Sequence, residues 1–361
     1  MEIAIIGLPK SGKTTLFNCL TGAKAPTDPF APTRAEPNVG VAKVPDPRLD
    51  GLTAIFKPKR TVNAEVKYVD VAIPKEKGKE IGSEALVHLG KADAFIHVVR
   101  AFVDASIPHP DGSVDPARDV DSMNMELAFS DMAIIERRLA RVNDSLKGAK
   151  GVEQDALLHE QALLSRIGSE LEKDVPVRQQ ALTTEETRLI QSYQFLTMKP
   201  MLQVLNIGED QIGEGPRLEA ELKSSYPEAT AAALCAKLEA ELSELGQDEA
   251  AEFRSAMGAG EPATERILRL SQQLLGLVTF FTIASGEVKA WTVATGTPAA
   301  KAAGKIHSDM ERGFIRAEVI SYPDLQRSGS LADARKHGLL RLEGKDYIVQ
   351  DGDVITFLFN V

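Results

Sequence analysis

The chain has 361 residues, a hydrophobic fraction of 43%, a charged fraction of 26% and a formal net charge of −10 at pH 7, which is typical of a globular protein with two or three domains. Its two cysteines, Cys19 and Cys235, are too few and too far apart for a disulfide framework or a zinc site. The sequence shows neither a signal-peptide pattern nor an apolar run of the roughly 18 residues that span a membrane. We therefore expect a cytoplasmic protein with no membrane partner. Because nucleic acid is bound by neutralising its phosphates, the negative charge excludes coating RNA with the whole surface and leaves only a local patch.

Near the start, residues Gly7 to Thr14 match the phosphate-binding pattern G-x-x-x-x-G-K-[ST]. An apolar strand, Glu2 to Ile6, precedes this P-loop, and a helix ended by Gly22 follows it. This order aims backbone N–H groups and a positive helix end at one point, where phosphate oxygens would sit. A chance glycine turn is the alternative, and the flanking strand and helix argue against it. The motif therefore predicts binding of a nucleoside triphosphate.

Within this motif, each polar residue has an expected role. Lys13 would reach the β- and γ-phosphates, and the Thr14 hydroxyl would hold Mg²⁺. The residues that we expect to bind nucleotide here are Lys10, Ser11, Gly12, Lys13, Thr14 and Thr15.

The first hundred residues read as alternating strands and helices, which predicts an α/β layer fold. Strands are expected at 39–44, 64–71 and 94–99. Asp70 lies at the end of the second of these, where a carboxylate could reach Mg²⁺ through water. An ordinary polar strand end is the alternative for this residue.

From about Asp121 to Arg188 the apolar residues recur at helical spacing, and Gly148 and Gly151 sit where two helices would reverse direction. This pattern predicts an antiparallel helical hairpin. Strand patterns return at 200–205 and 231–234, so the hairpin is an insertion into the first domain. One of its arms is basic, through Arg137, Arg138, Arg141, Lys147 and Lys150, and this face either contacts RNA or is simply solvated.

Two short segments follow the later strands, at the sheet edge where ligands collect in open α/β folds. Asn206 and Glu209 are three residues apart, with Ile207 between them, and could contact a purine base. Cys235 and Ala236 would close the base pocket from the other side. In this order after a P-loop, these segments predict a domain like that of small GTPases.

The last eighty residues have short strand patterns at 278–282, 287–293, 317–321 and 354–359, around one or two helices. A small mixed β domain is the simplest interpretation.

Several long runs of the sequence are specific enough to point to a known family. They are Gly7–Pro9, Glu36–Val41, Pro45–Leu49, His97–Arg100, Asn206–Glu209, Lys289–Val293, Ala303–His307, Arg312–Ile320 and Leu342–Asp353. On these residues the chain resembles the YchF group of Obg-related P-loop proteins, nearly from end to end.

The resemblance implies a P-loop G domain formed by residues 1–120 and 199–278, interrupted by the helical hairpin at 121–198. Residues 279–361 would form a TGS domain with the ubiquitin-like β-grasp fold. The resemblance also implies Mg²⁺ as cofactor and association of a monomer with ribosomal RNA and protein through the hairpin and the TGS domain. It further implies a preference for ATP over GTP.

That preference has a physical interpretation. Ordinary GTPases read guanine with Asn-Lys-x-Asp, whereas here Ile207 replaces the Lys and Glu209 replaces the Asp. The longer carboxylate displaces the pair of acceptors that guanine needs, and a site that leaves buried groups unpaired rejects the wrong base. ATP is the expected ligand, with GTP as the rival.

The switch regions depart from the family pattern. The family carries Asp-x-Ala-Gly after the strand that ends at Asp70, but this chain has Ile73 followed by Pro74, which lack the conformational freedom of glycine. Thr33 is the natural second Mg²⁺ ligand, in a segment about two residues longer than usual. Catalytic residues are therefore not assigned. The chain is either a slowly hydrolysing ATPase or GTPase switch, or a nucleotide-binding adaptor that has lost hydrolysis.

Overall fold

The computed structural model describes residues 1–27, 36–73 and 81–360. It divides into two compact units, one formed by Met1–Gly40 with Lys67–Thr264 and the other by Val41–Val66 with Glu265–Val361. Thr33 and Pro74, which the sequence analysis singled out, lie outside the described residues.

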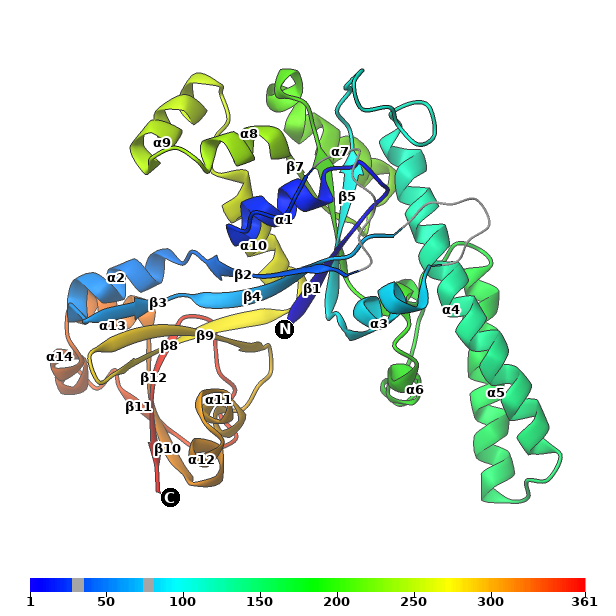
Figure 1. Cartoon of the computed structure of the whole chain (residues 1–361). Coiled ribbons are helices and arrows are strands. Elements are labelled where there is room, and N and C mark those ends of the chain that lie inside the picture. The colour runs from blue at the N-terminus through cyan, green and yellow to red at the C-terminus, as the bar shows by residue number, and fades with distance from the viewer. Residues whose placement is uncertain (28–35, 74–80, 361) are drawn as a thin grey trace. The chain divides into compact units, whose positions relative to one another are not determined.

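A six-stranded sheet organises the first unit (Figure 1). Its strands, in spatial order, are β2 (Asn38–Val44), β4 (Ala64–Asp70), β1 (Glu2–Ile6), β5 (Ala94–Arg100), β6 (Met201–Asn206) and β7 (Thr230–Leu234). The strands from β4 to β7 pair in parallel, so their carboxyl ends meet at one edge. The predicted strands of the α/β domain are thereby confirmed. The boundary between the two units falls within β2 and β4, since residues 41–44 and 64–66 of these strands belong to the second unit.

Helices cover both faces of this sheet. They are α1 (Lys13–Thr21), α3 (Ser83–Lys91), α7 (Gly215–Ser225), α8 (Ala236–Leu242) and α9 (Gln247–Ala256), with a 3₁₀ turn η4 (Glu209–Glu214) before α7. Helix α1 ends at Gly22, whose left-handed φ of 69° lets its N–H bond the Asn18 carbonyl, as the sequence predicted. Within the part of the chain that the structure describes, none of the helices combines the length and apolar character needed to cross a membrane.

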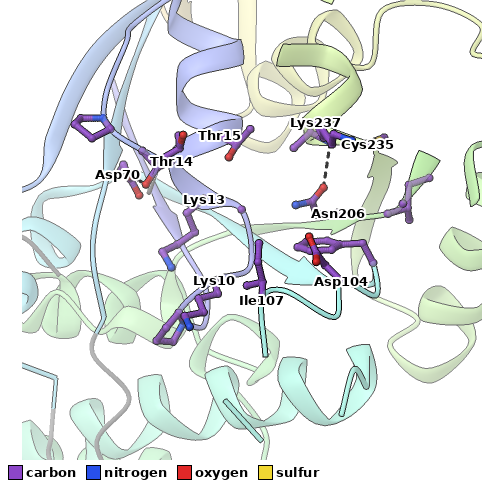
Figure 2. Close-up of a pocket in the computed structure, with 18 of the residues that line it drawn as sticks. Lys10, Lys13, Thr14, Thr15, Asp70, Asp104, Ile107, Asn206, Cys235 and Lys237 are labelled. Carbon is purple, nitrogen blue, oxygen red and sulfur yellow. Dashed lines mark hydrogen bonds between the residues drawn. The ribbon is translucent and has the colours of Figure 1, made fainter. Parts of the chain in front are cut away.

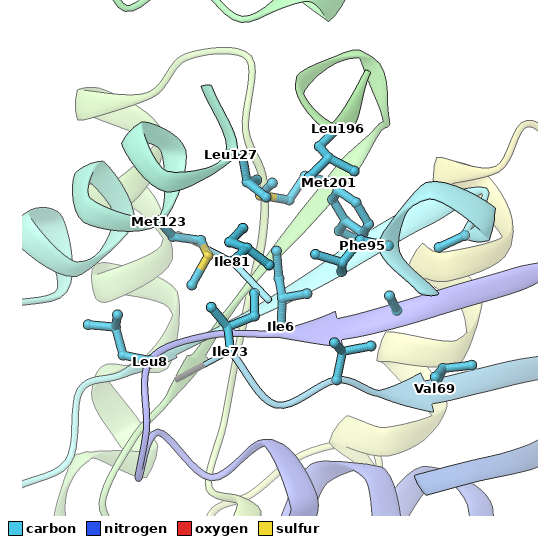
Figure 3. Packing of buried hydrophobic residues seen from close by; sticks show 14 residues of the cluster. Ile6, Leu8, Val69, Ile73, Ile81, Phe95, Met123, Leu127, Leu196 and Met201 are labelled. Carbon is cyan, nitrogen blue, oxygen red and sulfur yellow. The ribbon is translucent and has the colours of Figure 1, made fainter. Parts of the chain in front are cut away.

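One apolar cluster joins the sheet to α3 and to the root of the next helix (Figure 3). Ile6 and Phe95 come from the strands, and Met123 and Leu127 from helix α4 (Pro116–Leu146). Ile73 lies in the same cluster and is 6% exposed. The segment that leaves β4 beyond Asp70 is therefore packed into the core by an isoleucine side chain.

The helical hairpin consists of α4 and α5 (Val152–Leu171). In the chain it follows β5 and precedes β6, which confirms the predicted insertion. Leu163, Leu164 and Ile167 of α5 pack against Ile135 of α4. Four short elements lead back to the sheet: η1 (Val177–Gln179), α6 (Thr184–Ile190), η2 (Gln191–Tyr193) and η3 (Leu196–Met198).

A buried carboxylate ties the root of the hairpin to this return segment. Asp131 of α4 accepts hydrogen bonds from the backbone N–H groups of Leu196 and Thr197, at 2.7 and 2.8 Å, and from the Thr197 hydroxyl at 2.7 Å. Its side chain is fully buried, and this burial raises the pKa of Asp131 to about 6 although the three hydrogen bonds oppose the shift.

A second six-stranded sheet organises the second unit. Its strands, in spatial order, are β11 (Arg341–Glu343), β10 (Phe314–Ser321), β12 (Asp353–Phe359), β8 (Leu277–Ala284), β9 (Glu287–Ala294) and β3 (Arg60–Val62). The β8–β9 hairpin is antiparallel and β12 pairs with β8 in parallel, the arrangement expected of a β-grasp fold. The four predicted strands are confirmed, whereas β3 and β11 were not predicted.

The helices of this unit are α2 (Pro47–Phe56), α10 (Ala263–Leu274, which begins in the first unit), α11 (Ala299–Ile306), α12 (Ser308–Arg312), α13 (Tyr322–Ser328) and α14 (Leu331–Lys336). Helices pack on both faces of the sheet. Leu49 and Leu52 of α2 pack against Phe281 and Ile320 on one face. Alanines of α11 pack against Phe280 and Phe357 on the other.

An arginine fixes the start of α2 to the strand end before β12. Asp46 caps the helix by accepting the backbone N–H of Arg48 at 2.9 Å. The Arg48 guanidinium pairs with Asp46 at 2.8 Å and with Asp351 at 2.6 Å, and it lies 5.3 Å from the centre of the Phe281 ring. These contacts explain why a segment so early in the chain belongs to the second unit.

Candidate nucleotide-binding site

A cavity of ≈ 770 Å³ opens at the carboxyl edge of the first sheet, and all of its lining residues belong to the first unit. It lies between the P-loop and the segments that follow β4, β5, β6 and β7. Figure 2 shows Thr14 and Asp70 on one side of it and Asn206, Asp104 and Cys235 on the other. Its volume is in the range of pockets that enclose a small organic ligand.

Two glycines let the P-loop approach its neighbours. A Cβ on Gly7 would lie 2.4 Å from the Val98 carbonyl oxygen, and a Cβ on Gly12 would lie 2.1 Å from the Asn206 amide nitrogen. Gly12 also has φ 96° and ends the loop where α1 begins, so the first N–H groups of that helix face the cavity without helical partners. The buried hydroxyl of Ser11 has no hydrogen-bond partner among the described residues. This cradle fits a phosphate chain.

The lysine of the motif, Lys13, lines the cavity. The Lys13 ammonium donates to the carbonyl of Leu8 at 2.9 Å. Burial lowers the pKa of Lys13 to about 8, and the nearby Asp70 carboxylate opposes that shift. A triphosphate would add negative charge beside this ammonium and raise its pKa again.

We therefore expect nucleotide affinity to fall as pH rises above about 8, because binding then requires Lys13 to take up a proton. At one pH unit above the pKa of the free protein, the dissociation constant for MgATP should be roughly tenfold larger than at neutral pH. Isothermal titration calorimetry across this range in buffers of different ionisation enthalpy measures both the affinity and the proton uptake. Lys13→Arg, which stays protonated, should show no such dependence; an equal slope in both proteins would contradict this assignment.

Two of the three residues expected to hold Mg²⁺, Thr14 and Asp70, lie side by side, and the third, Thr33, is outside the described residues. The Thr14 hydroxyl donates to Asp70 Oδ2 at 2.8 Å, and the side chain of Asn38 donates to the same oxygen at 3.1 Å. Asp70 is 5% exposed, and hydroxyl and carboxylate oxygens are the hard ligands that Mg²⁺ prefers. These oxygens fit the metal. Asn38 orients the carboxylate and was not predicted from the sequence.

Asn206 connects three segments of the site. Its amide nitrogen donates to the Ser11 carbonyl at 2.9 Å, and its amide oxygen accepts the Ala236 N–H at 3.0 Å. Its backbone carbonyl accepts the N–H groups of Ala101 and Phe102 at 2.8 and 3.1 Å. The side chain thus holds the P-loop and the β7–α8 connection in place, with one amide hydrogen left to face a ligand.

The other residues expected near the base differ in their surroundings. Ile207 is 4% exposed and packs in an apolar cluster with Val99 and Leu205. Glu209 pairs with Lys237 at 2.8 Å, and both side chains are exposed. Cys235 is buried, and burial raises the pKa of its thiol, so it is a packing residue at the cavity wall.

Sequence reasoning missed the loop after β5. Phe102, Val103, Asp104 and Ile107 line the cavity beside Asn206. The Arg100 guanidinium holds this loop in place by donating to the carbonyls of Phe102 at 3.2 Å and Ile107 at 2.8 Å. The sequence could have predicted this part of the site, because the loop follows a buried parallel strand at the sheet edge where ligands collect.

Comparison with known proteins places these features in a family. A family model described as a 50S ribosome-binding GTPase matches residues 2–135, and the YchF-GTPase C-terminal model, described as a protein of unknown function, matches residues 277–360. The protein named ribosome-binding ATPase YchF in Bacillus subtilis is 42% identical over 368 residues, covering 100% of both chains. The chain belongs to the YchF family. Obg-like ATPase 1 of Caenorhabditis elegans is 35% identical over 375 residues, covering 100% of this chain and 92% of its own.

A solved structure agrees with the family assignment. The YchF GTPase of Schizosaccharomyces pombe superposes with a TM-score of 0.87 at 29% identity, covering 99% of this chain and 97% of its own. The expected fold, a P-loop domain with a helical insertion and a β-grasp domain at the C-terminus, is thereby confirmed for this YchF-family chain.

At the position after Asp70-Val71-Ala72, where the resemblance led us to expect glycine, the chain has Ile73. Ala72 and Ile73 line the cavity, and the Ile73 side chain points into the cluster of Ile6 and Met123 (Figure 3). A β-branched residue lacks the freedom to turn its amide at φ > 0 as glycine does. A rotation of the backbone at Ile73 would therefore also require this YchF-family chain to move an apolar side chain out of a packed cluster.

Proposed function

We propose that this chain is a Mg²⁺-dependent ATPase that acts as a nucleotide-controlled switch on the ribosome. The observation that carries the proposal is the phosphate cradle of the P-loop, with Lys13 at its centre and the Thr14 hydroxyl 2.8 Å from Asp70. Support for ATP and for the ribosome comes from the relatives that are named ribosome-binding ATPases. The test is a titration of MgATP and MgGTP against the purified protein, with turnover measured in the same preparation.

In this proposal each residue has a defined task. Lys10, Gly12 and Thr15 line the cavity and surround the phosphates with Lys13. Ser11, whose buried hydroxyl has no partner among the described residues, joins them. The Lys13 ammonium leaves the Leu8 carbonyl for the β- and γ-phosphates. The oxygens of Thr14 and Asp70 hold Mg²⁺, with Thr33 as a further ligand. When bound, Mg²⁺ neutralises charge that develops on the phosphate oxygens. Asn206, Ile207, Glu209, Cys235 and Ala236 form the wall next to the base.

For the base, we predict tighter binding of ATP than of GTP. Glu209 is paired with Lys237 and does not offer the short carboxylate that guanine needs, and Ile207 does not offer a lysine. The double change Ile207→Lys with Glu209→Asp should shift the preference toward GTP. Competition of each nucleotide against a fluorescent ATP analogue measures the ratio. A wild-type protein that favours GTP tenfold, ~1.4 kcal/mol, would contradict the prediction.

A control is needed because Ile207 is buried in an apolar cluster. A lysine placed there costs stability unless its ammonium reaches water. Inorganic tripolyphosphate, which has no base, should bind the double variant and the wild type alike. A loss of tripolyphosphate binding would show damage to the P-loop and not a change in base choice.

For hydrolysis, we predict basal turnover roughly 10²–10³-fold below that of relatives with the glycine, since one preorganised donor to the γ-phosphate is missing. Ile73→Gly with Pro74→Leu should restore part of the rate. Single-turnover hydrolysis of labelled ATP, with and without ribosomes, measures it. Ile73→Ala with Pro74→Leu is the matched control, because it also empties part of the apolar cluster and removes the proline but still lacks the conformational freedom of glycine. Wild-type turnover equal to that of glycine-containing relatives would refute this account.

For ribosome association, we propose that the hairpin and the C-terminal β-grasp domain make the contacts. Arg138 pairs with Glu160 at 2.6 Å, and the Tyr193 hydroxyl donates to the same carboxylate. The other basic residues of this arm, Arg137, Arg141, Lys147 and Lys150, are exposed. A protein that works on ribosomes in this way is cytoplasmic, and we propose that it acts as a monomer. We further propose the domain division 1–120 with 199–278, 121–198 and 279–361.

A further inference from the structure

We propose that Lys10, the fourth residue of the P-loop motif, is a catalytic residue whose ammonium stabilises the charge that develops around the γ-phosphate during hydrolysis. The inference deepens the proposed function and rests on it, because it assigns part of the ATPase reaction to one side chain. Lys13 serves the binding of the triphosphate, whereas Lys10 serves its cleavage.

The backbone of Lys10 has a conformation that lysine rarely adopts. Its φ is 64°, in the left-handed region, where the Cβ atom of an L-residue crowds a carbonyl oxygen and glycine or asparagine is usual. Gly12 also has a positive φ, of 96°, whereas Ser11 between them does not. Such alternation turns successive N–H groups toward one point and forms an anion-binding nest. The loop therefore keeps a strained lysine at a position that glycine would fill without strain, which points to a task for the side chain.

The Lys10 side chain lies at the phosphate end of the cavity. It is half-buried and belongs to the lining together with Lys13 and Ile73. Figure 2 shows it on the same side of the pocket as Lys13, away from Asn206 and Cys235. A flexible four-carbon stem lets a lysine ammonium reach a phosphate oxygen from such a position.

Lys10 is one of three lysines in the described lining of the cavity, which includes no arginine. Lys13 donates to the Leu8 carbonyl at 2.9 Å and is the expected ligand of the β- and γ-phosphates. Lys237 pairs with Glu209 at 2.8 Å, in the wall next to the base. The second cation at the phosphate end is therefore Lys10.

The reaction gives a cation at this place a defined role. The oxygen of a water molecule bonds to the γ-phosphorus while the bond from that phosphorus to the β–γ bridging oxygen breaks. ADP leaves with the bonding electron pair, and both hydrogens of the water stay with the released phosphate as H₂PO₄⁻. Negative charge grows on the bridging and γ-oxygens, and a cation beside them stabilises the transition state more than the bound substrate, as an arginine finger does. Lys10 keeps its own protons throughout.

The segment after β4 makes such a cation important. Ile73 stands where the resemblance led us to expect glycine, and its side chain is packed in an apolar cluster, so its amide is not free to turn toward the γ-phosphate. Lys10 comes from the P-loop wall and reaches the phosphate without moving that cluster. We therefore expect the hydrolysis that remains in this chain to depend on Lys10.

The experiment uses the full chain with three changes at Lys10. Lys10→Gly removes the side chain and adopts the same backbone conformation without strain, Lys10→Met keeps the length without the charge, and Lys10→Arg keeps the charge. In single-turnover assays the first two should hydrolyse MgATP about a hundredfold more slowly. By calorimetry their dissociation constants for MgATP should stay within roughly threefold of wild type. Lys10→Arg should keep roughly a tenth or more of the wild-type rate.

The matched control is Lys24→Met, which removes the charge of an exposed lysine shortly after α1. It should bind and hydrolyse MgATP as wild type does. Thermal melts of all four variants should match wild type, because the Lys10 side chain lines a cavity and is not part of an apolar cluster.

A transition-state analogue gives a readout that does not depend on turnover. MgADP with aluminium fluoride mimics the phosphoryl group in transfer, and an enzyme complementary to the transition state binds it more tightly than MgADP alone. Lys10→Met should reduce this preference about tenfold or more, and Lys10→Arg should keep it. The affinity for MgADP alone should not change in any variant, because Lys10 acts at the γ-position.

Each remaining outcome is decisive. If Lys10→Gly and Lys10→Met hydrolyse MgATP and bind the analogue as wild type does, Lys10 is not catalytic. If their affinity for MgATP falls as far as their rate, Lys10 is a ligand of the bound substrate, which overturns the catalytic role and leaves the proposed function intact. If Lys10→Arg is as slow as Lys10→Met, the charge is not what matters and the role is refuted. If wild type itself does not hydrolyse MgATP, with or without ribosomes, the proposed function fails before any variant is compared.

Discussion

Replacing Lys13 by alanine is expected to weaken the binding of MgATP by about 3 kcal/mol, roughly a hundredfold, while leaving the fold intact. Lys13 lines the cavity, and its ammonium would meet the β- and γ-phosphates away from bulk water, where a charge-assisted hydrogen bond is strong. In the nucleotide-free protein its hydrogen bond goes to a single backbone carbonyl, that of Leu8, and its burial is already unfavourable to the charge. The fold therefore loses little.

Calorimetry with MgATP, beside far-UV circular dichroism, measures both parts of this prediction. Thr14→Ala should weaken Mg²⁺-dependent binding but leave the metal-free component, because its hydroxyl faces Asp70. Lys24→Ala removes an exposed lysine shortly after α1 and should bind as wild type does. Unchanged binding by the Lys13 variant would refute the assignment of this cavity to a triphosphate.

The second large effect concerns Asp131, which we expect to hold the hairpin to the nucleotide-binding fold. Asp131→Ala should lower the free energy of unfolding by about 3–5 kcal/mol, because two buried backbone N–H groups and the Thr197 hydroxyl lose their acceptor at ~1–3 kcal/mol each. Such a loss is a large part of the ~5–15 kcal/mol that stabilises a domain. Urea denaturation followed by circular dichroism measures it.

Asp144→Ala on the same helix is the control for that experiment. Its carboxylate makes an exposed pair with Lys147, so the change should stay within about 0.5 kcal/mol. If both variants unfold at the same urea concentration, the buried hydrogen bonds of Asp131 do not stabilise the junction.

The titration of Asp131 gives the prediction a pH dependence. Its pKa is about 6 in the folded protein against 3.8 for a free side chain. The folded state therefore binds more protons between these values, and the contribution of this group to the free energy of unfolding falls as pH rises from about 4 to 6. In Asp131→Asn this part of the pH dependence should disappear.

Much of the first unit could be predicted because its signals are local. The P-loop occupies consecutive residues between a strand and a helix, and Gly7 and Gly12 are required by close approaches that no other residue allows. Buried parallel strands such as β5 are mostly apolar runs, and the hairpin repeats its apolar residues at helical spacing. Asp70 could be placed because the end of a parallel strand always faces the ligand edge.

What could not be predicted depends on contacts between distant residues. Nothing near Arg60 indicates that β3 pairs with β9 more than 200 residues later, since three residues are too few for a periodic pattern. Ile207 was read as a base-reading position, and only the packing of Val99 and Leu205 around it shows that its side chain is buried. The ion pair of Glu209 with Lys237 likewise requires two strand ends to be neighbours, which sequence spacing does not reveal.

Arg48 pairs with both Asp46 and Asp351, so residues 41–66 and the C-terminal part of the chain form one folded unit and cannot be exchanged separately. Deleting the chain from residue 279 onward would remove Phe281, Ile320 and Asp351, and would leave Leu49 and Leu52 without the apolar partners against which they pack. Strand β2 starts at Asn38, which donates a hydrogen bond to Asp70 in the cavity, and leads along the chain to α2, whose apolar residues would then be exposed. Replacing the C-terminal part would therefore also require new partners for Leu49, Leu52 and Arg48.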